Sequence, residues 1–240
     1  MPDFARAGDT TMTTKRNRFR DLRERFHDPT LTVLTILLAV LMFGIGPLQA
    51  VGILGAHHFA IVMALVMVAG IFIVSGSPLA VAALLVAIAL VVVATVLRLR
   101  QPSSLDLFLD AGAWAIAGLT LSFVVARAVF APGRITSHRV VGAVLLYLVI
   151  GFTFTAFFCF VALLEPNAFA GLRPLQDNLA VASNFGYFSF VTLTSVGYGD
   201  IVPVHPYARG FANVEAIIGQ LYPATLLARL VTLEVAGRQR

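Results

Sequence analysis

The residues with the clearest chemical potential form one short run, 194–200, with the sequence TSVGYGD. Its chemistry lies in the backbone, because glycines at alternate positions let a chain adopt left-handed angles that other residues avoid. Such a backbone can present successive carbonyl oxygens in one direction, and a dehydrated cation needs close oxygens in place of its water. Pro203 and Pro206 follow and prevent a continuing helix. The run is therefore suited to holding a cation through main-chain oxygens.

No motif of a known enzyme class accompanies this run. The sequence has no His-Glu-x-x-His, no Gly-x-Ser-x-Gly and no Cys/His cluster, so we expect no enzyme. The single cysteine, Cys159, cannot form an intrachain disulfide and is expected to be an inert buried thiol. The pair His57–His58 is open to a pH-sensing or metal-binding interpretation, although interfacial histidines are more often inert.

Composition predicts a membrane protein. Of the 240 residues, 59% are hydrophobic and 12% are charged, whereas a soluble domain carries about 25% charge. Mean hydropathy is +0.90. From Pro29 to Leu97 there is no charged residue, and this run is far longer than the roughly 20 residues that one membrane helix needs. The basic balance does not indicate nucleic acid, because the basic residues lie at the ends of apolar segments.

Six apolar segments predict an all-α membrane protein with six transmembrane helices. These segments cover residues 31–54, 59–74, 79–97, 107–130, 140–164 and 210–231. A shorter segment, residues 179–194, is too short to cross and return, and it predicts a re-entrant helix that dips into the membrane. The non-helical run after it is tolerated at that depth only inside protein or beside a water-filled path.

The distribution of basic residues predicts the orientation. With six spans, most of them fall on one side, before the first span, between the fourth and fifth, and after the sixth. The positive-inside rule places that side, with both termini, in the cytoplasm and residues 165–209 outside. Residues 1–28 are too long for the basic part of a signal peptide, so we expect an uncleaved first span in a multi-pass cell membrane protein.

The run at 194–200 resembles the signature of the potassium channel family, which is often written TTVGYGD. Residues 187–193 resemble that family's pore helix, and residues 210–231 resemble the inner helix of bacterial members. The resemblance covers spans five and six, about 100 residues, and the first four spans match the voltage-gated layout in number and length. It implies a basic cytoplasmic segment (1–28), a four-helix voltage-sensor-like domain (29–131) and a pore domain (132–240).

The resemblance also implies a homotetramer in which four copies surround one ion path. The backbone carbonyls of four residues would then bind potassium, the permeant ion; these are Ser195, Val196, Gly197 and Tyr198. The Ser195 hydroxyl would form the innermost ring, where the family usually has threonine. Residues that would support the filter are Thr194, Gly199, Asp200, Tyr187 and Phe188, with Tyr198 packing against the last two. No other cofactor is expected, and the remaining partner is the lipid bilayer.

Span six holds a glycine and a proline one turn apart, Gly219 and Pro223. The resemblance implies a gating hinge there, and the alternative is a packing role, because small residues let helices approach closely. Glu215 is open to two interpretations, a carboxyl group hydrogen-bonded behind the pore helix or a proton site for gating. Gln220 is expected to face the water-filled cavity.

Span four lacks the repeated arginines of a voltage sensor. It carries Arg127 at its inner end and Asp110 at its outer end, and we expect no counter-charge for either in spans two and three. Strong voltage dependence therefore has no source. The expectation is a potassium-selective channel; the alternatives are a non-conducting regulatory subunit of another channel and a potassium transporter subunit. Nothing in the sequence indicates the gating stimulus.

Overall fold

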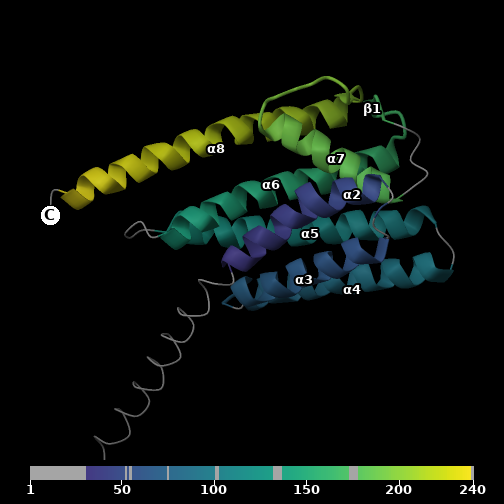
Figure 1. Cartoon of the computed structure of the whole chain (residues 1–240), viewed down its shortest axis with the longest axis horizontal. Coiled ribbons are helices and arrows are strands. Elements are labelled where there is room, and N and C mark those ends of the chain that lie inside the picture. The colour runs from purple at the N-terminus through teal and green to yellow at the C-terminus, as the bar shows by residue number, and fades with distance from the viewer. Residues whose placement is uncertain are drawn as a thin grey trace, which may run out of the picture.

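The computed structural model describes residues 31–51, 53, 56–74, 76–100, 103–131, 137–172 and 178–238, which are almost entirely helical. The described part of a first helix runs from residue 31 through a π-helical segment, η1 (Val40–Ile45), into α2 (Gly46–Ala50). The remaining elements are α3 (Ala56–Val74), α4 (Pro78–Arg100), α5 (Ser104–Val129), α6 (Ser137–Leu164), β1 (Phe169–Ala170), α7 (Asn178–Leu193), β2 (Val202–Pro203) and α8 (Pro206–Arg238) (Figure 1).

Within the described residues, each apolar segment of the sequence lies mostly in a helix of this fold. Among the described residues, four helical stretches are long and apolar enough to cross a membrane, namely Leu31–Leu48, Pro78–Arg100, Ser104–Val129 and Val140–Leu164. The protein is thus a helical membrane protein. Helix α3 contains a shorter apolar stretch, Ile61–Ile71, and no part of α8 is among the four stretches found in the described residues. The second and sixth spans therefore remain predictions.

The helices before residue 131 pack directly on those after it. One core joins buried side chains of the first helix, α3, α4, α5 and α6, including Leu38, Leu84, Leu121 and Val149. Figure 1 shows α3 and α4 beside α5, α5 beside α6, and α2 beside α7. The predicted boundary between residues 131 and 132 therefore lies between two helices that share a core. The first helices therefore pack against the C-terminal part through this shared core.

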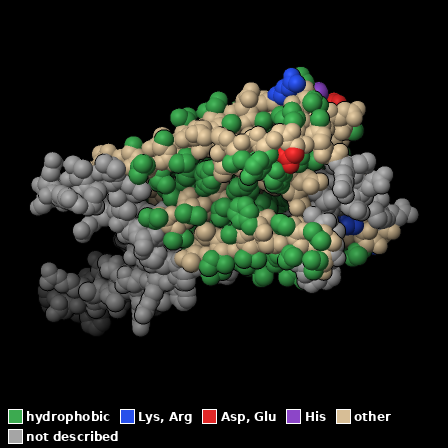
Figure 2. Space-filling view, turned by 45° about the horizontal axis from the view of Figure 1, so that its top comes forward, with side chains coloured by type: hydrophobic (Ala, Val, Ile, Leu, Met, Phe, Trp, Pro, Cys, Tyr) green, Lys and Arg blue, Asp and Glu red, His purple; other side chains and the backbone are tan. Residues whose placement is uncertain are grey.

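The outer surface is apolar, as lipid exposure or subunit contact would require. Figure 2 shows hydrophobic side chains spread over the described face, with few charged groups among them. Several large apolar side chains of α4 and α8 are about half exposed or more, among them Val92, Val214, Ile217 and Leu221. A water-soluble monomer rarely exposes so continuous an apolar surface.

The charged residues at the joint of α4 and α5 correct two expectations. Residues 98–106 were expected to form a polar loop, but α4 continues to Arg100 and α5 begins at Ser104. Asp110 was expected to have no counter-charge in spans two and three, but α4, the helix of the third span, extends to include Arg98, whose guanidinium bonds both the Asp110 carboxylate and, at 2.9 Å, that of Asp106. Asp106 is fully buried and also accepts the backbone N–H of Ser103, at 2.8 Å. Paired charges explain why these groups are tolerated there.

Two described side chains in the C-terminal half of α8, Tyr222 and Arg229, make polar contacts with other parts of the chain. The Tyr222 hydroxyl donates to the carbonyl oxygen of Ala143 at 2.8 Å. The Arg229 guanidinium donates to the carbonyl oxygens of Phe130 and Ala131, at 2.7 and 2.9 Å, just past the end of α5. A cation at a helix C-terminus is favourable, because the last carbonyl groups carry partial negative charge. Beyond these contacts α8 extends past the helices beside it (Figure 1).

Candidate functional site

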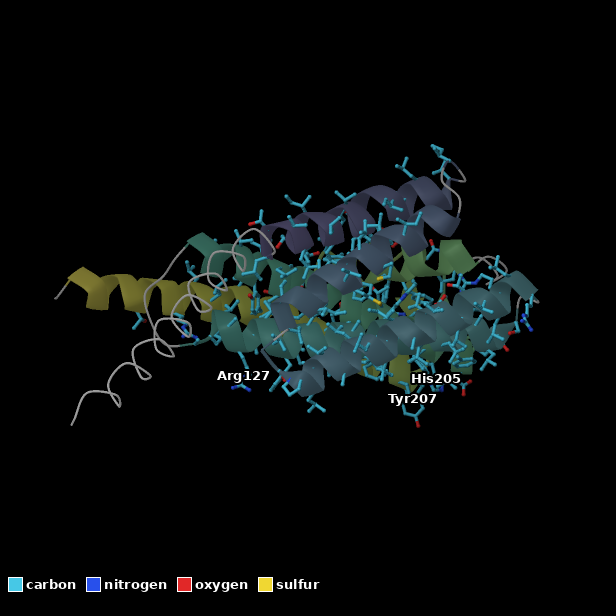
Figure 3. The ribbon with its side chains drawn as sticks, turned by 90° about the horizontal axis from the view of Figure 1, so that it is seen from below. Arg127, His205 and Tyr207 are labelled. Carbon is cyan, nitrogen blue, oxygen red and sulfur yellow. The ribbon has the colours of Figure 1, made fainter. Side chains whose placement is uncertain are left out.

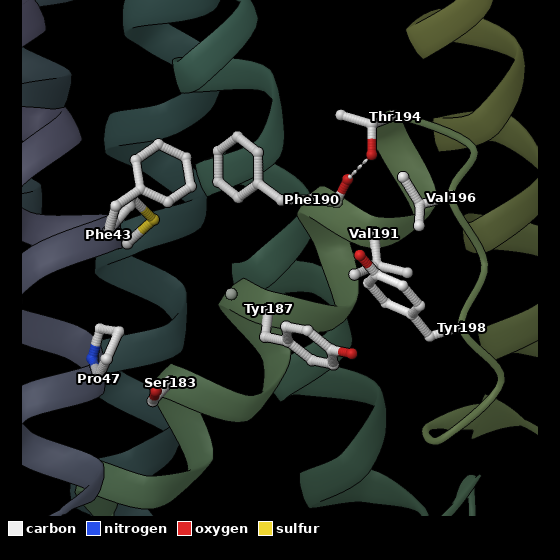
Figure 4. Close-up of a pocket in the computed structure, with 11 residues that line it drawn as sticks. Phe43, Pro47, Ser183, Tyr187, Phe190, Val191, Thr194, Val196 and Tyr198 are labelled. Atoms are coloured by element: carbon white, nitrogen blue, oxygen red, sulfur yellow. Dashed lines mark hydrogen bonds between the residues drawn. The ribbon is translucent and has the colours of Figure 1, made fainter.

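The short helix α7 ends where the TSVGYGD run begins. The Thr194 hydroxyl donates back to the Phe190 carbonyl oxygen at 2.6 Å, and the Ser195 N–H donates to the Thr192 carbonyl oxygen at 2.9 Å. On its other side α7 is held by the first helix, where the rings of Phe43 and Phe190 meet edge to face at 4.9 Å (Figure 4). The end of α7 is therefore fixed from two directions.

The backbone of the run alternates in conformation. The φ angle is +57° at Ser195, +59° at Gly197 and +78° at Gly199, whereas the other non-glycine residues described, including Val196 and Tyr198, have negative φ. Backbone that alternates in this way turns its N–H groups toward one side. Here the N–H groups of Val196 and Gly197 both donate to the Val191 carbonyl oxygen, at 3.0 and 3.4 Å. These two N–H groups face α7. In a planar trans peptide the C=O points opposite to the N–H, so the carbonyl groups of Ser195 and Val196 point away from α7.

The end of the run is anchored by the two short strands. β1 and β2 pair antiparallel, with Phe169 opposite Pro203 and Ala170 opposite Val202. The N–H groups of Val204 and His205 both donate to the Ala168 carbonyl oxygen, at 2.8 and 3.2 Å. The chain that leaves the run is thereby tied to the chain that leaves α6, so the run is fixed at both ends.

Of the two aromatic residues expected to brace the run, Tyr187 and Phe188, the fold brings one to Tyr198. The Tyr187 and Tyr198 rings are parallel, with centroids 6.4 Å apart (Figure 4). Phe188 differs from the expectation, because its buried ring packs against Phe158 and Phe169, at 4.8 and 5.5 Å. It supports α7 rather than the run itself.

A cavity of about 370 Å³ lies beside the run, between the first helix, α7 and Tyr198 (Figure 4). Its walls include Phe43, Ser183 and Val196. Among the described residues, no cluster of three or more His, Cys, Asp or Glu side chains could hold a metal ion. The side chains of His57 and His58 lie outside the described part of the structure.

Helix α8 packs against the end of α7 at Gly219. A Cβ atom added at Gly219 would overlap the carbonyl oxygen of Leu193, the last residue of α7. The Tyr147 hydroxyl donates to that same oxygen at 3.3 Å. This close approach favours a packing role for Gly219. Helix α8 is continuous through Gly219 and Pro223, and a hinge at these residues stays a prediction.

Two polar side chains of α8 reach the α7 region from either side of this contact. The Gln220 side-chain amide donates to the Ser195 hydroxyl oxygen at 2.7 Å. One turn earlier, the fully buried Glu215 places Oε1 2.5 Å from the Ser189 hydroxyl oxygen. Neither partner was expected from the sequence, although an acidic residue in an apolar helix signals that a polar partner must exist.

The Ser189 contacts predict a protonated Glu215 side chain, because one hydroxyl proton cannot serve both neighbouring oxygens. The Ser189 hydroxyl oxygen also lies 2.7 Å from the Gly151 carbonyl oxygen, and a hydroxyl group has one proton to donate. A carbonyl oxygen cannot donate, so Ser189 donates to Gly151 and both contacts are satisfied when protonated Glu215 donates to Ser189. This chain of hydrogen bonds joins α8, α7 and α6.

A Glu215→Gln variant is therefore expected to assemble and function nearly as the parent does, because the amide can still donate to Ser189. The parent should show an infrared carbonyl band of a protonated carboxylic acid that is absent from Glu215→Gln. Glu215→Leu is the matched comparison, since it removes the donor, and it should lower thermal stability by about 1 kcal/mol, the scale of one hydrogen bond. A parent protein without the protonated-acid band would contradict this assignment.

The comparisons with known proteins address the C-terminal part of the chain. Residues 143–235 match a family model described as "Ion channel". Two curated relatives are both named Protein LctB. The one from Bacillus caldotenax is 39% identical over 56 residues, which is 23% of this chain and 41% of the relative. The one from Geobacillus stearothermophilus is 41% identical over 69 residues, which is 28% of this chain and 46% of the relative.

Each match spans less than half of the relative's length, and no solved structure matches the chain. The family match begins in α6 and ends in α8. It thus encloses α7, the TSVGYGD run, and the contacts of Glu215, Gly219 and Gln220 with them. The part of this helical membrane protein that is similar to the ion-channel family is therefore residues 143–235.

Proposed function

We propose that this chain is one subunit of a homotetrameric, potassium-selective channel, and that residues 194–200 form its selectivity filter. The observation that carries the proposal is the alternating backbone, with positive φ at Ser195, Gly197 and Gly199. Its N–H edge is bonded to Val191, so the opposite edge can offer carbonyl oxygens to a dehydrated cation. The carbonyls of Ser195, Val196, Gly197 and Tyr198 are the proposed ligands.

Assembly into a tetramer is supported by what one copy leaves exposed. Val196 and Tyr198 are 51% and 71% exposed in the single chain. A carbonyl edge facing lipid would be unsatisfied, which costs several kcal/mol per group. Four copies around one axis replace lipid with a water-filled path, and the exposed apolar face of α8 then lies between subunits or along that path. We therefore expect native mass spectrometry in mild detergent to show a tetramer; a dimer or monomer as the largest species would contradict the proposal.

Cation flux into liposomes that hold the purified protein alone tests conduction itself. Potassium flux should exceed sodium flux, and empty liposomes are the control. Assembly into tetramers without flux would favour the alternative of a non-conducting regulatory subunit. The other alternative, a potassium transporter subunit, would show flux only with a coupling ion or another subunit.

Voltage is expected to change the open probability only weakly. Moving one charge through 100 mV is worth about 2.3 kcal/mol, and steep gating needs several such charges in each subunit. Arg127 is exposed at the end of α5, with its guanidinium over the Phe123 ring at 5.7 Å, and Figure 3 shows it pointing away from the helices. Asp110 is paired with Arg98, so it adds no free charge.

Planar-bilayer recordings of the purified protein test this expectation at positive and negative voltages. Arg127→Gln should leave the weak dependence unchanged. A steep open-probability curve, equivalent to several gating charges and retained in Arg127→Gln, would show that another part of the chain senses voltage.

A further inference from the structure

The hydrogen bond between Gln220 and Ser195 reaches the inner end of the run directly from α8. The amide nitrogen lies 2.7 Å from the hydroxyl oxygen, and both residues are exposed. The contact is set by the residue before it, because Gly219 lets α8 lie against the Leu193 carbonyl oxygen. The bond therefore depends on the backbone packing of two helix ends rather than on a chance contact of two long side chains.

Ser195 is the one member of the run whose side-chain oxygen is proposed to meet the ion, and its rotamer is weakly determined by its own chemistry. A serine χ1 has three staggered positions, whereas the β-branched threonine is stiffer at χ1. The neighbouring hydroxyl group, that of Thr194, is engaged by the Phe190 carbonyl oxygen at 2.6 Å and does not compete. Among the described residues, the Gln220 amide is the side-chain group that hydrogen-bonds the Ser195 hydroxyl.

We propose, on the basis of the proposed potassium channel function, that Gln220 is a positioning residue that fixes the Ser195 hydroxyl and so sets the affinity and selectivity of the innermost ion site. The amide donates to one lone pair of the hydroxyl oxygen and leaves the other for the ion. It carries no charge, so it orients this oxygen without attracting or repelling cations. An oxygen held in place discriminates between cations by size, whereas a freely rotating oxygen adapts to either.

The proposal predicts a specific rescue. Gln220→Met removes the donor at similar length, so the Ser195 hydroxyl should rotate freely. Adding Ser195→Thr to that variant supplies a methyl group that restricts the same rotation, and it should restore the parent behaviour. Leu221→Met is the matched control, because it changes the adjacent exposed residue of α8 to the same side chain. A purely structural role of Gln220 in α8 would not be rescued by a methyl group in the filter.

Two readouts on the full-length tetramer separate this inference from the proposed function. The first is the potassium-to-sodium permeability ratio in planar bilayers. The second is the potassium concentration that gives half of the maximal thermal stabilisation in detergent, which reports ion binding without requiring conduction. In Gln220→Met the permeability ratio should fall and the half-stabilising concentration should rise, each by about fivefold, the scale of one hydrogen bond. Ser195→Thr/Gln220→Met should return within about twofold of the parent, well inside that same scale.

The possible results distinguish failure of the Gln220 inference from failure of the proposed channel function. A parent protein that binds and conducts potassium, with a Gln220→Met variant that matches it in both readouts, would overturn the inference and leave the channel proposal standing. The same holds if Gln220→Met is impaired but Ser195→Thr does not rescue it, or if Leu221→Met is impaired equally. A parent protein that neither conducts potassium nor is stabilised by it would overturn the proposed function, and this inference with it.

Discussion

Replacing Gly197 with alanine is expected to abolish the preference for potassium over sodium while leaving membrane insertion and assembly intact. Gly197 has φ of +59°, a conformation that costs a residue with a Cβ atom roughly 1–2 kcal/mol. Apart from its two chain neighbours, no described residue has an atom within 4 Å of an added Cβ, so the cost is conformational rather than steric. The alternation would be lost at the centre of the run, and the adjacent carbonyl groups would turn away from the ion path in all four subunits.

The control for this variant is Gly186→Ala. Gly186 lies in α7, and an added Cβ there also has no neighbour within 4 Å, but its φ is not in the left-handed region. Potassium and sodium flux into liposomes should therefore be selective in Gly186→Ala and unselective or absent in Gly197→Ala. A Gly197→Ala variant with the parent's selectivity would remove this residue from the ion path.

The second large effect is expected for Gly219→Ala, which should weaken or prevent the packing of α8 against α7. The added methyl group would overlap the Leu193 carbonyl oxygen, which is backbone and cannot move aside as a side chain can. Overpacking of this kind typically costs about 1–3 kcal/mol, here in each subunit. It would also pull Gln220 from Ser195 and Glu215 from Ser189, so tetramer stability and flux should fall together.

Gly210→Ala is the matched control in the same helix, because an added Cβ at Gly210 meets nothing within 4 Å in the chain. Alanine is the better helix former by about 1 kcal/mol, so this variant should be as stable as the parent or more so. Thermal unfolding of the tetramer in detergent separates the two variants. Equal stability of Gly219→Ala and the parent would show that α8 does not approach α7 so closely in the assembled protein.

The sequence predicted the helices well, because long apolar runs that end at polar turns leave little choice of structure in a membrane. Residues 179–194 were expected to form a short helix, and α7 covers Asn178–Leu193. The conformation of the run was predictable in part, since Gly197 and Gly199 indicate positive φ at alternate positions. That Ser195 extends the pattern, with φ of +57°, was not predictable, because serine carries no preference for that region.

The contacts that join α8 to α7 and to the TSVGYGD run could not be predicted from the sequence, for a physical reason. They depend on which faces of α6, α7 and α8 meet, and nearly uniform hydrophobicity hides the faces of a membrane helix. Glu215 signalled that a partner existed, but any small polar residue of α7 or α6 could have supplied it, and Ser189 does. Arg98 was assigned to a loop because charge usually ends an apolar span, whereas its ion pairs let α4 continue.

The packing of the first helix was also unexpected. A four-plus-two layout suggested a separate domain for residues 29–131, but α2 lies against α7 and the Phe43 ring contacts Phe190. Since α7 directly precedes the run, the first helix supports the end of α7 from which the run starts. This contact fits the proposal of a channel whose first helices are a scaffold rather than a moving voltage sensor.

The most direct test of the potassium channel proposal is the reversal potential of single-channel currents from the purified protein in a planar bilayer, with potassium on one side and an equal concentration of sodium on the other. We predict that the currents reverse at a voltage far from zero, with the sign expected when potassium flows out of its own side. In Gly197→Ala the reversal voltage should move to near zero. Currents that reverse near zero voltage in the parent would contradict potassium selectivity. Absence of any current from a protein shown to be tetrameric would contradict the assignment of residues 194–200 as a conducting filter.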